Sequence, residues 1–209
     1  MVKIKICGLR RMEDVAMVNL LHPDYVGFVF APSRRQLSLA EAQTLKQHLD
    51  PSIQSVGVFV DAPTKTICSA AQSGCIDVIQ LHGAEPAAQI QLLQQKTGLP
   101  IIKAIRVQSR EQLLLSDSLP CDFLLLDTFI PGQAGGSGQP FEWSCIPPLT
   151  KPYFVAGGLT PETVSTVFQY CAPYGVDVSS GVETDGYKDF QKIQQFMKQI
   201  KDGDFHETR

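Results

Sequence analysis

Asp127 is the carboxyl group best placed to do chemistry in this sequence. It ends an apolar run, residues 123–126, so we expect its side chain to emerge where a buried strand reaches its end. An apolar setting disfavours the charged carboxylate, and a protonated carboxyl group can act as a general acid. The alternative role for such a residue is a helix cap or a salt-bridge partner.

Cys7 ends the first apolar run and is followed by Gly8. A thiol there could be catalytic, although a free cysteine is more often an inert core residue. We interpret the remaining five cysteines as inert core residues. They are Cys68, Cys75, Cys121, Cys145 and Cys171. Because no Cys-x-x-Cys pair occurs and the four histidines lack metal-ligand spacing, we expect neither a disulfide framework nor a catalytic metal.

Two small-residue turns could bind a phosphate group. Gly157 and Gly158 follow one apolar run, and Ser180 and Gly181 follow the next. Small residues allow backbone N–H groups to approach an anion, and a helix N-terminus would add to the attraction. Tight turns without a ligand are the alternative interpretation.

The longest irregular segment, residues 128–139, contains four glycines, among them Gly136. Long loops in compact domains tend to be functional, so this one could close over the same phosphorylated ligand. The alternative is a flexible connector.

These residues must be positioned by a regular set of elements. Eight short runs of β-forming apolar residues recur about every 22 to 30 residues. They are residues 4–7, 25–30, 55–60, 77–81, 101–105, 123–127, 153–156 and 175–178.

Segments with helical period separate the runs. The clearest is the last, where Phe190, Ile193, Phe196, Met197 and Ile200 form one apolar stripe that should pack on the sheet. The segment Thr160-Pro161-Glu162 supplies an N-cap, a proline for the first helical position and an early acid, and so predicts a helix that begins at Pro161.

Strands that alternate with helices of about 8 to 14 residues imply right-handed crossovers and a parallel sheet. Eight such units predict an α/β protein with a single-domain (β/α)8 TIM barrel over residues 1–209, in which residues 203–209 form a frayed tail. A doubly wound open sheet is the alternative. In a barrel, the active site forms at the carboxyl ends of the strands, so Cys7, Arg35, His82 and Asp127 should meet the glycine turns there.

Composition restricts the partners. The chain has 18 Lys plus Arg against 21 Asp plus Glu, a net charge of -3, without basic runs or an acidic tail. We therefore expect a small-molecule ligand and neither nucleic acid nor a membrane as partner. The start, MVKIKICGLR, lacks the apolar core of a signal peptide, which predicts a cytoplasmic location.

Motifs in nearly every strand, in order from residue 3 to Lys188, carry a family resemblance. They are Lys5-Ile6-Cys7-Gly8, Gly27-Phe28-Val29-Phe30 with Pro32 and Arg35, Val56-Gly57-Val58-Phe59-Val60, Gln80-Leu81-His82-Gly83, Leu125-Leu126-Asp127-Thr128, Gly135-Gly136-Ser137-Gly138, Ala156-Gly157-Gly158-Leu159, and Val176-Asp177-Val178-Ser179-Ser180-Gly181-Val182-Glu183. As a set they resemble the phosphoribosylanthranilate isomerases, the barrel enzymes of tryptophan biosynthesis.

The resemblance implies an Amadori rearrangement of N-(5-phosphoribosyl)anthranilate to 1-(2-carboxyphenylamino)-1-deoxyribulose 5-phosphate. In the family pattern Cys7 is the base and Asp127 the acid, Arg35 meets the anthranilate end, and His82 and Asp177 lie near the pocket. Since the substrate's own nitrogen serves as the electron sink, no cofactor is implied.

Arg34-Arg35-Gln36 departs from the expected Pro-Arg followed by an apolar or aromatic residue, so how the aryl group is held stays open. Two other functions stay open as well. One is a different phosphosugar isomerase on the same barrel, and the other is a catalytically silent barrel that binds a phosphorylated metabolite.

Overall fold

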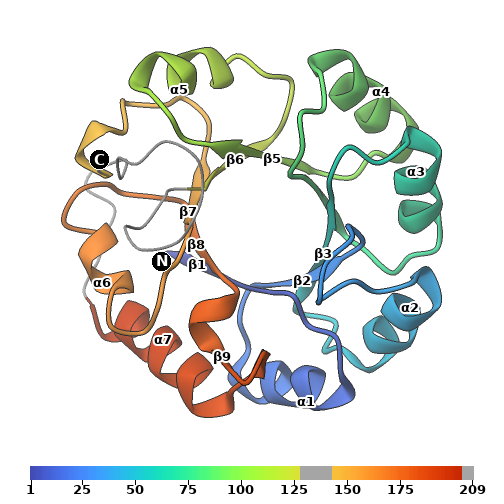
Figure 1. Ribbon diagram of the computed structural model, residues 1–209, viewed down its shortest axis with the longest axis vertical. Coiled ribbons are helices and arrows are strands. Elements are labelled where there is room, and N and C mark those ends of the chain that lie inside the picture. Colours follow the sequence, from blue (N-terminus) through green and yellow to red (C-terminus); the bar gives the residue numbers. More distant parts are fainter. Residues whose placement is uncertain (128–142, 204–209) are drawn as a thin grey trace.

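The eight apolar runs form the eight parallel strands of a closed barrel in the computed structural model (Figure 1). The strands are β1 (Lys3–Cys7), β2 (Tyr25–Val29), β3 (Gln54–Phe59), β4 (Val78–Leu81), β5 (Ile101–Arg106), β6 (Phe123–Asp127), β7 (Tyr153–Ala156) and β8 (Gly175–Val178). The structure describes residues 1–127 and 143–203, so part of the predicted tail and most of the β6–β7 connection lie outside it. The predicted (β/α)8 fold is confirmed.

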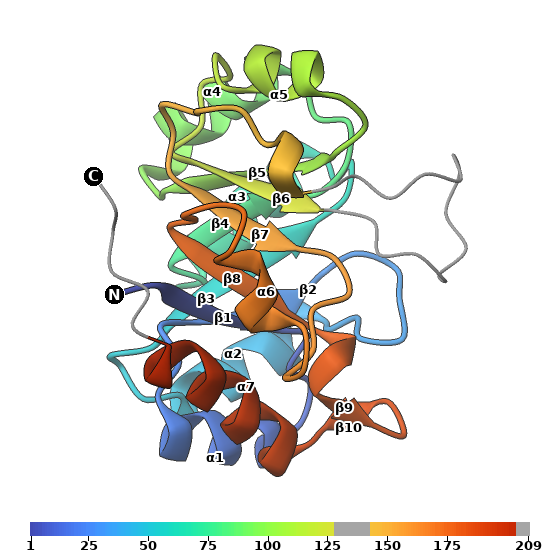
Figure 2. The same ribbon diagram turned by 90° about the vertical axis from the view of Figure 1, so that its left-hand side faces the viewer.

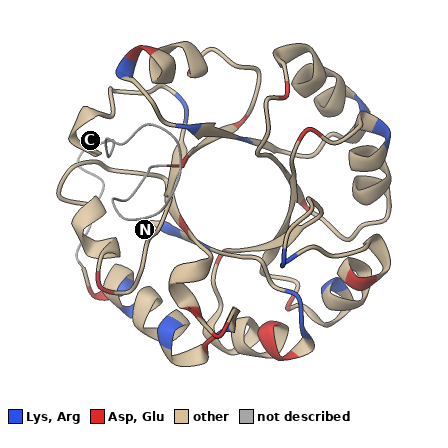
Figure 3. Cartoon of the chain, in the orientation of Figure 1, with Lys and Arg blue, Asp and Glu red and all other residues tan. Residues whose placement is uncertain are grey.

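Helices surround the barrel on its outside (Figure 1). They are α1 (Met12–Leu21), α2 (Leu39–His48), α3 (Thr64–Gln72), α4 (Ala87–Thr97), α5 (Arg110–Ser116), α6 (Val164–Val167) and α7 (Phe190–Asp202), with short 3-10 turns η1 (Trp143–Cys145) and η2 (Ser180–Val182). None of the helices within the two described ranges has the length and apolar character needed to cross a bilayer. Basic and acidic residues are interspersed around this outer ring (Figure 3).

The strands carry two hydrophobic layers because successive side chains point to opposite faces. On β1, Ile4 and Ile6 pack outward in the core between sheet and helices, so Lys5 and Cys7 point into the barrel. The barrel interior holds a second apolar cluster, which consists of Tyr25, Val56, Val78, Ile102, Ala104, Leu125, Phe154 and Ala156. This inner cluster supports the floor of the site described below.

Helix α7 packs against the barrel through its apolar stripe, as predicted. Ile193, Phe196, Met197 and Ile200 are all buried. Asp189 caps the helix, since its side chain accepts hydrogen bonds from the backbone N–H groups of residues 191 and 192 at 2.9 and 3.1 Å.

The predicted helix lengths are wrong in two places. Helix α5 has 7 residues and α6 only 4, and α6 begins at Val164 instead of Pro161. The carbonyl of Thr160 accepts hydrogen bonds from both Thr163 N and Val164 N, so the first turn is tightened toward 3-10 geometry before regular α-helix starts. Thr160 still begins the turn.

A small antiparallel hairpin follows β8. Its strands are β9 (Glu183–Thr184) and β10 (Tyr187–Lys188). Figure 2 shows it at the same end of the molecule as the loop that follows β2, and Arg10 joins the two, since it donates hydrogen bonds to the carbonyls of Arg34 and Gly186. The hairpin thereby brings two charged side chains, Glu183 and Lys188, to the mouth of the barrel.

Candidate active site

A cavity of about 360 Å³ lies at the carboxyl ends of the barrel strands. Nine of the ten predicted site residues line it: Cys7, Arg35, His82, Asp127, Gly157, Gly158, Asp177, Ser180 and Gly181. The tenth, Gly136, lies outside the described residues. Residues separated by up to 174 positions in the sequence thus meet because each lies near or just after the carboxyl end of a strand of the closed ring.

Cys7 is a buried thiol at the end of β1. It lies opposite Gly27 in the register of β1 and β2, and its carbonyl accepts a hydrogen bond from Ser179 Oγ at 3.0 Å. Burial raises the pKa of the thiol, while the positive charges of Lys5 and Lys188 oppose that rise. The thiol is therefore shielded from water, and its charged neighbours include the cations Lys5 and Lys188 and the carboxylate of Asp177.

Asp127 ends β6 with a side chain that is 33% exposed, which is more open than its apolar strand predicts. Its Oδ2 lies 3.3 Å from Nε2 of His82, and Nδ1 of His82 lies 2.9 Å from Nε2 of Gln80. An amide N–H can only donate, so Nδ1 is the acceptor in this arrangement and Nε2–H of His82 donates to Asp127. Gln80 and His82 thus orient the carboxyl group.

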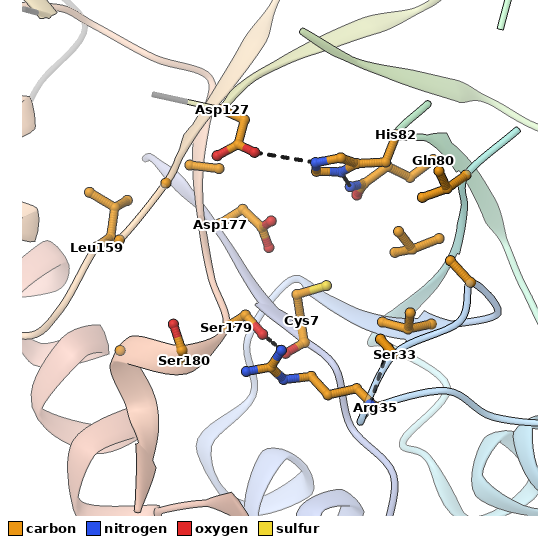
Figure 4. A pocket seen from close by; sticks show the side chains of 18 of the residues that line it. Cys7, Ser33, Arg35, Gln80, His82, Asp127, Leu159, Asp177, Ser179 and Ser180 are labelled. Atoms are coloured by element: carbon orange, nitrogen blue, oxygen red, sulfur yellow. Dashed lines mark hydrogen bonds and ion pairs between the residues drawn. The ribbon is translucent and has the colours of Figure 1, made fainter. Parts of the chain in front are cut away.

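Cys7 and Asp127 come from strands three places apart around the ring of eight. In Figure 4, Asp127 and His82 lie on one side of the pocket, Cys7 and Arg35 on the other, and Asp177 between them. A ligand in the cavity would therefore have a carboxyl group on one side and a thiol on another.

Arg35 is held by Glu183 of the β9–β10 hairpin. Nε and Nη2 of Arg35 donate to the two carboxylate oxygens at 2.7 and 2.8 Å. Arg34 Nη2 and Lys188 Nζ donate to the same carboxylate, each at 2.8 Å. The bidentate contact between Arg35 and Glu183 fixes the plane of the Arg35 guanidinium group at the edge of the cavity.

Glu183 and Gln80 are site residues that the sequence reasoning missed. Both occur in the quoted motifs, and neither received a role there. Gln80 lies two residues before His82, so both project from the same face of the strand, and that spacing could have linked them. Nothing local links Glu183 to Arg35, which is 148 residues away.

The charge on Glu183 should contribute to stability in a pH-dependent way. Burial alone would raise its pKa, yet the hydrogen bonds from Arg35 and Lys188 hold the pKa at about 2, below the ordinary 4.5. A depressed pKa stabilises the fold above the unfolded-state value and loses that effect as the pH falls toward the folded value. We expect Glu183→Gln to lower the free energy of unfolding at pH 7 by up to about 3 kcal/mol, because three cations lose their partner.

Urea unfolding of both proteins at pH 7 and pH 3 checks this expectation. The difference between wild type and Glu183→Gln should shrink at pH 3, because the wild-type carboxylate has then lost part of its advantage. An equal difference at both pH values would contradict the assigned ion pairs.

The two small-residue turns lie against each other. Gly157 and Gly158 adopt left-handed backbone angles, with φ of 94° and 64°, which side chains other than glycine rarely tolerate. A Cβ atom on Gly181 would collide with the carbonyl of Leu159, so only glycine permits this packing. Turn η2 begins at Ser180, and both Ser180 and Gly181 line the cavity. The predicted helix N-terminus after β7 lies farther on, at Val164.

Within the described ranges, no group of three or more His, Cys, Asp or Glu side chains is arranged to hold a metal ion. All six cysteines fall in those ranges and are free thiols.

Comparison with known proteins connects this geometry to a family. The family model described as N-(5'-phosphoribosyl)anthranilate isomerase matches residues 4–199. The chain belongs to this isomerase family. The predicted resemblance is therefore confirmed over nearly the whole length of the barrel.

Individual relatives agree with this assignment. The N-(5'-phosphoribosyl)anthranilate isomerase of Lacticaseibacillus casei is 46% identical over 207 residues, which cover 99% of this chain and 98% of the relative. That of Acetivibrio thermocellus is 41% identical, with 96% of each chain covered.

Solved structures of the isomerase family share the fold. The phosphoribosylanthranilate isomerase of Thermotoga maritima superposes with a TM-score of 0.85 at 36% identity, covering 97% of this chain and 100% of that one. A second structure, at 32% identity and a TM-score of 0.83 with the same coverage, is a complex with reduced 1-(o-carboxyphenylamino)-1-deoxyribulose 5-phosphate.

Proposed function

We propose that this protein catalyses the Amadori rearrangement of N-(5'-phosphoribosyl)anthranilate, with Cys7 as base and Asp127 as acid. The observation that carries the proposal is the gathering of nine predicted site residues in one cavity of a barrel that belongs to the isomerase family. The product, 1-(2-carboxyphenylamino)-1-deoxyribulose 5-phosphate, is an intermediate of tryptophan biosynthesis.

Asp127 begins the reaction by donating a proton to the ring oxygen of the sugar. The bond between C1 and that oxygen then breaks, and the nitrogen lone pair forms a C1=N iminium ion. His82 is 3.3 Å from the carboxylate that remains, so its N–H can stabilise the new negative charge.

The Cys7 thiolate then removes the proton from C2, because the neighbouring iminium ion makes that proton acidic. The electron pair of the C2–H bond moves into a C1=C2 double bond and neutralises the nitrogen. Protonation at C1 and loss of the C2 hydroxyl proton complete the ketone. C2 is oxidised and C1 reduced, so no external oxidant or reductant is needed.

We assign the two ends of the substrate to opposite parts of the cavity. The phosphate fits the turns at Gly157–Gly158 and Ser180–Gly181, where small residues expose backbone N–H groups to an anion. Gly136 stays a predicted phosphate contact. The anthranilate carboxylate fits Arg35, whose guanidinium plane Glu183 holds in place. His82 and Asp177 stay predicted contacts to the substrate.

We further propose that residues 1–209 form one domain, because strands from Lys3 through Val178 close a single ring. Cytoplasmic location also stays a prediction, and the six free thiols fit a reducing compartment.

A fluorescence assay tests the proposed activity. The purified protein should consume the fluorescent anthranilate-ribosyl substrate at an enzymatic rate, and the aminoaldose substrate of histidine biosynthesis is tested beside it. Turnover of the second substrate alone would favour a different isomerase on this barrel, and turnover of neither would favour a silent binding protein.

A further inference from the structure

Lys5 is a charged residue buried inside the barrel, and the mechanism above gives it no role. Its side chain is 0% exposed. It lies on β1 two residues before Cys7, and both side chains point to the interior because Ile4 and Ile6 pack outward. An ammonium group therefore lies in the layer directly beneath the thiol, on the same strand.

The hydrogen-bond partner of Lys5 is Asp177 on β8. Nζ of Lys5 lies 2.9 Å from Oδ1 of Asp177, and the two residues are paired in the register of β1 and β8. Asp177 lines the cavity together with Cys7. An ammonium group has three N–H donors, so one carboxylate contact leaves donors for the sulfur atom above.

The charged groups around the Cys7 sulfur come from four elements. Lys5 on β1 and Lys188 on β10 favour the thiolate, and Asp177 on β8 opposes it. The positive charge of Arg35, in the loop after β2, would also be attracted to an ionised Cys7. Glu183 already forms ion pairs with both Lys188 and Arg35. Lys5 instead has Asp177 as its carboxylate partner.

Stability alone does not account for this ion pair. Removing two charges from water costs more free energy than a buried pair usually returns, and apolar residues of similar volume fill such positions equally well. Lys5 is fully buried one layer below Cys7, and its partner Asp177 lines the cavity in which the proposed mechanism needs an ionised sulfur atom.

We propose that Lys5 is the counter-ion of the Cys7 thiolate and that the negative charge of Asp177 partly offsets the effect of Lys5. When the thiol ionises, its proton leaves to solvent and the electron pair stays on sulfur, where the ammonium group stabilises it. When the thiolate takes up the C2 proton, the S–H bond re-forms and Lys5 returns to its single partner. The role of this arrangement in catalysis rests on the proposed function, but the effect of Lys5 on the ionisation of the Cys7 thiol does not. Lys5 is thus a positioning residue that acts through Cys7.

The pH dependence of Cys7 alkylation tests the proposal in the free protein. Iodoacetamide reacts with the thiolate, and mass spectrometry of the Cys7 peptide separates its rate from those of the other cysteines. Lys5→Met should move the midpoint of the pH–rate profile of Cys7 alkylation upward by about one pH unit or more. Below the midpoint this corresponds to about a tenfold slower reaction. Asp177→Asn should move the midpoint downward and accelerate the reaction.

Lys103→Met is the matched control. Lys103 is also buried on a barrel strand, and its Nζ pairs with Glu85 at 2.9 Å. This variant removes a comparable ion pair away from Cys7 and should leave the alkylation profile of Cys7 unchanged.

A folded Lys5→Met protein with the wild-type profile would overturn the proposal. So would shifts in the same direction in Lys5→Met and Asp177→Asn, because that result indicates general loosening of the barrel. If Lys5→Met does not fold, faster alkylation of Asp177→Asn supports the proposal and an unchanged or slower rate overturns it. The two variants could shift the alkylation midpoint in opposite directions while the wild-type protein fails to turn over the anthranilate-ribosyl substrate. That combination would contradict the proposed function but not the role of Lys5.

Discussion

Cys7→Ser should lower kcat by about 10²- to 10⁴-fold and leave KM nearly unchanged. Serine matches the shape of cysteine, but its hydroxyl group does not ionise near neutral pH even beside a buried ammonium. The proposed base for the C2 proton is therefore lost while the cavity keeps its form. Steady-state kinetics with the anthranilate-ribosyl substrate measures both constants.

Cys75→Ser is the control for this experiment. Cys75 is also buried, but it follows α3 outside the cavity, where its thiol faces the carbonyl of Ala70. Its replacement should leave kcat at the wild-type level. If Cys7→Ser turned over at a rate close to wild type, Cys7 could not be the base.

Asp127→Asn should also lower kcat by about 10²- to 10⁴-fold, for a different reason. The amide preserves size and one hydrogen-bond acceptor, but it has no acidic proton for the ring oxygen. Ring opening should then limit the reaction. A deuterium label at C2 should consequently show a reduced isotope effect on kcat in Asp127→Asn, and a full primary effect in Cys7→Ser.

Asp122→Asn serves as the matched control. Asp122 immediately precedes the same strand at its other end, where its Oδ2 accepts a hydrogen bond from the backbone N–H of Ile101 at 2.8 Å. It should retain wild-type kcat. Equal isotope effects in Asp127→Asn and Cys7→Ser would contradict the separation of acid and base between the two residues.

The barrel could be predicted from sequence because its strands are buried on both sides. All eight apolar runs form strands, within one or two residues of the expected ends. The helices were less predictable because their lengths depend on packing and local turns. The four-residue α6 illustrates this, since Thr160 begins a tight turn that the cap signal does not distinguish from a regular helix.

The site was predictable where it follows strand ends. Cys7, His82 and Asp127 each end or follow a strand, and the fold brings them to one cavity. The strand-end rule did not by itself favour Cys7, which gained its role through the family motifs. Charge partners were not predictable, because Lys5–Asp177 and Arg35–Glu183 are 172 and 148 residues apart and meet only when the ring closes.

The release of a tritium label from C2 of the substrate to water tests the central claim most directly. The wild-type protein should release the label as it forms product, and Cys7→Ser should release it at least about 100-fold more slowly. Release by Cys7→Ser at the wild-type rate would show that another group removes the C2 proton and would contradict the assigned roles.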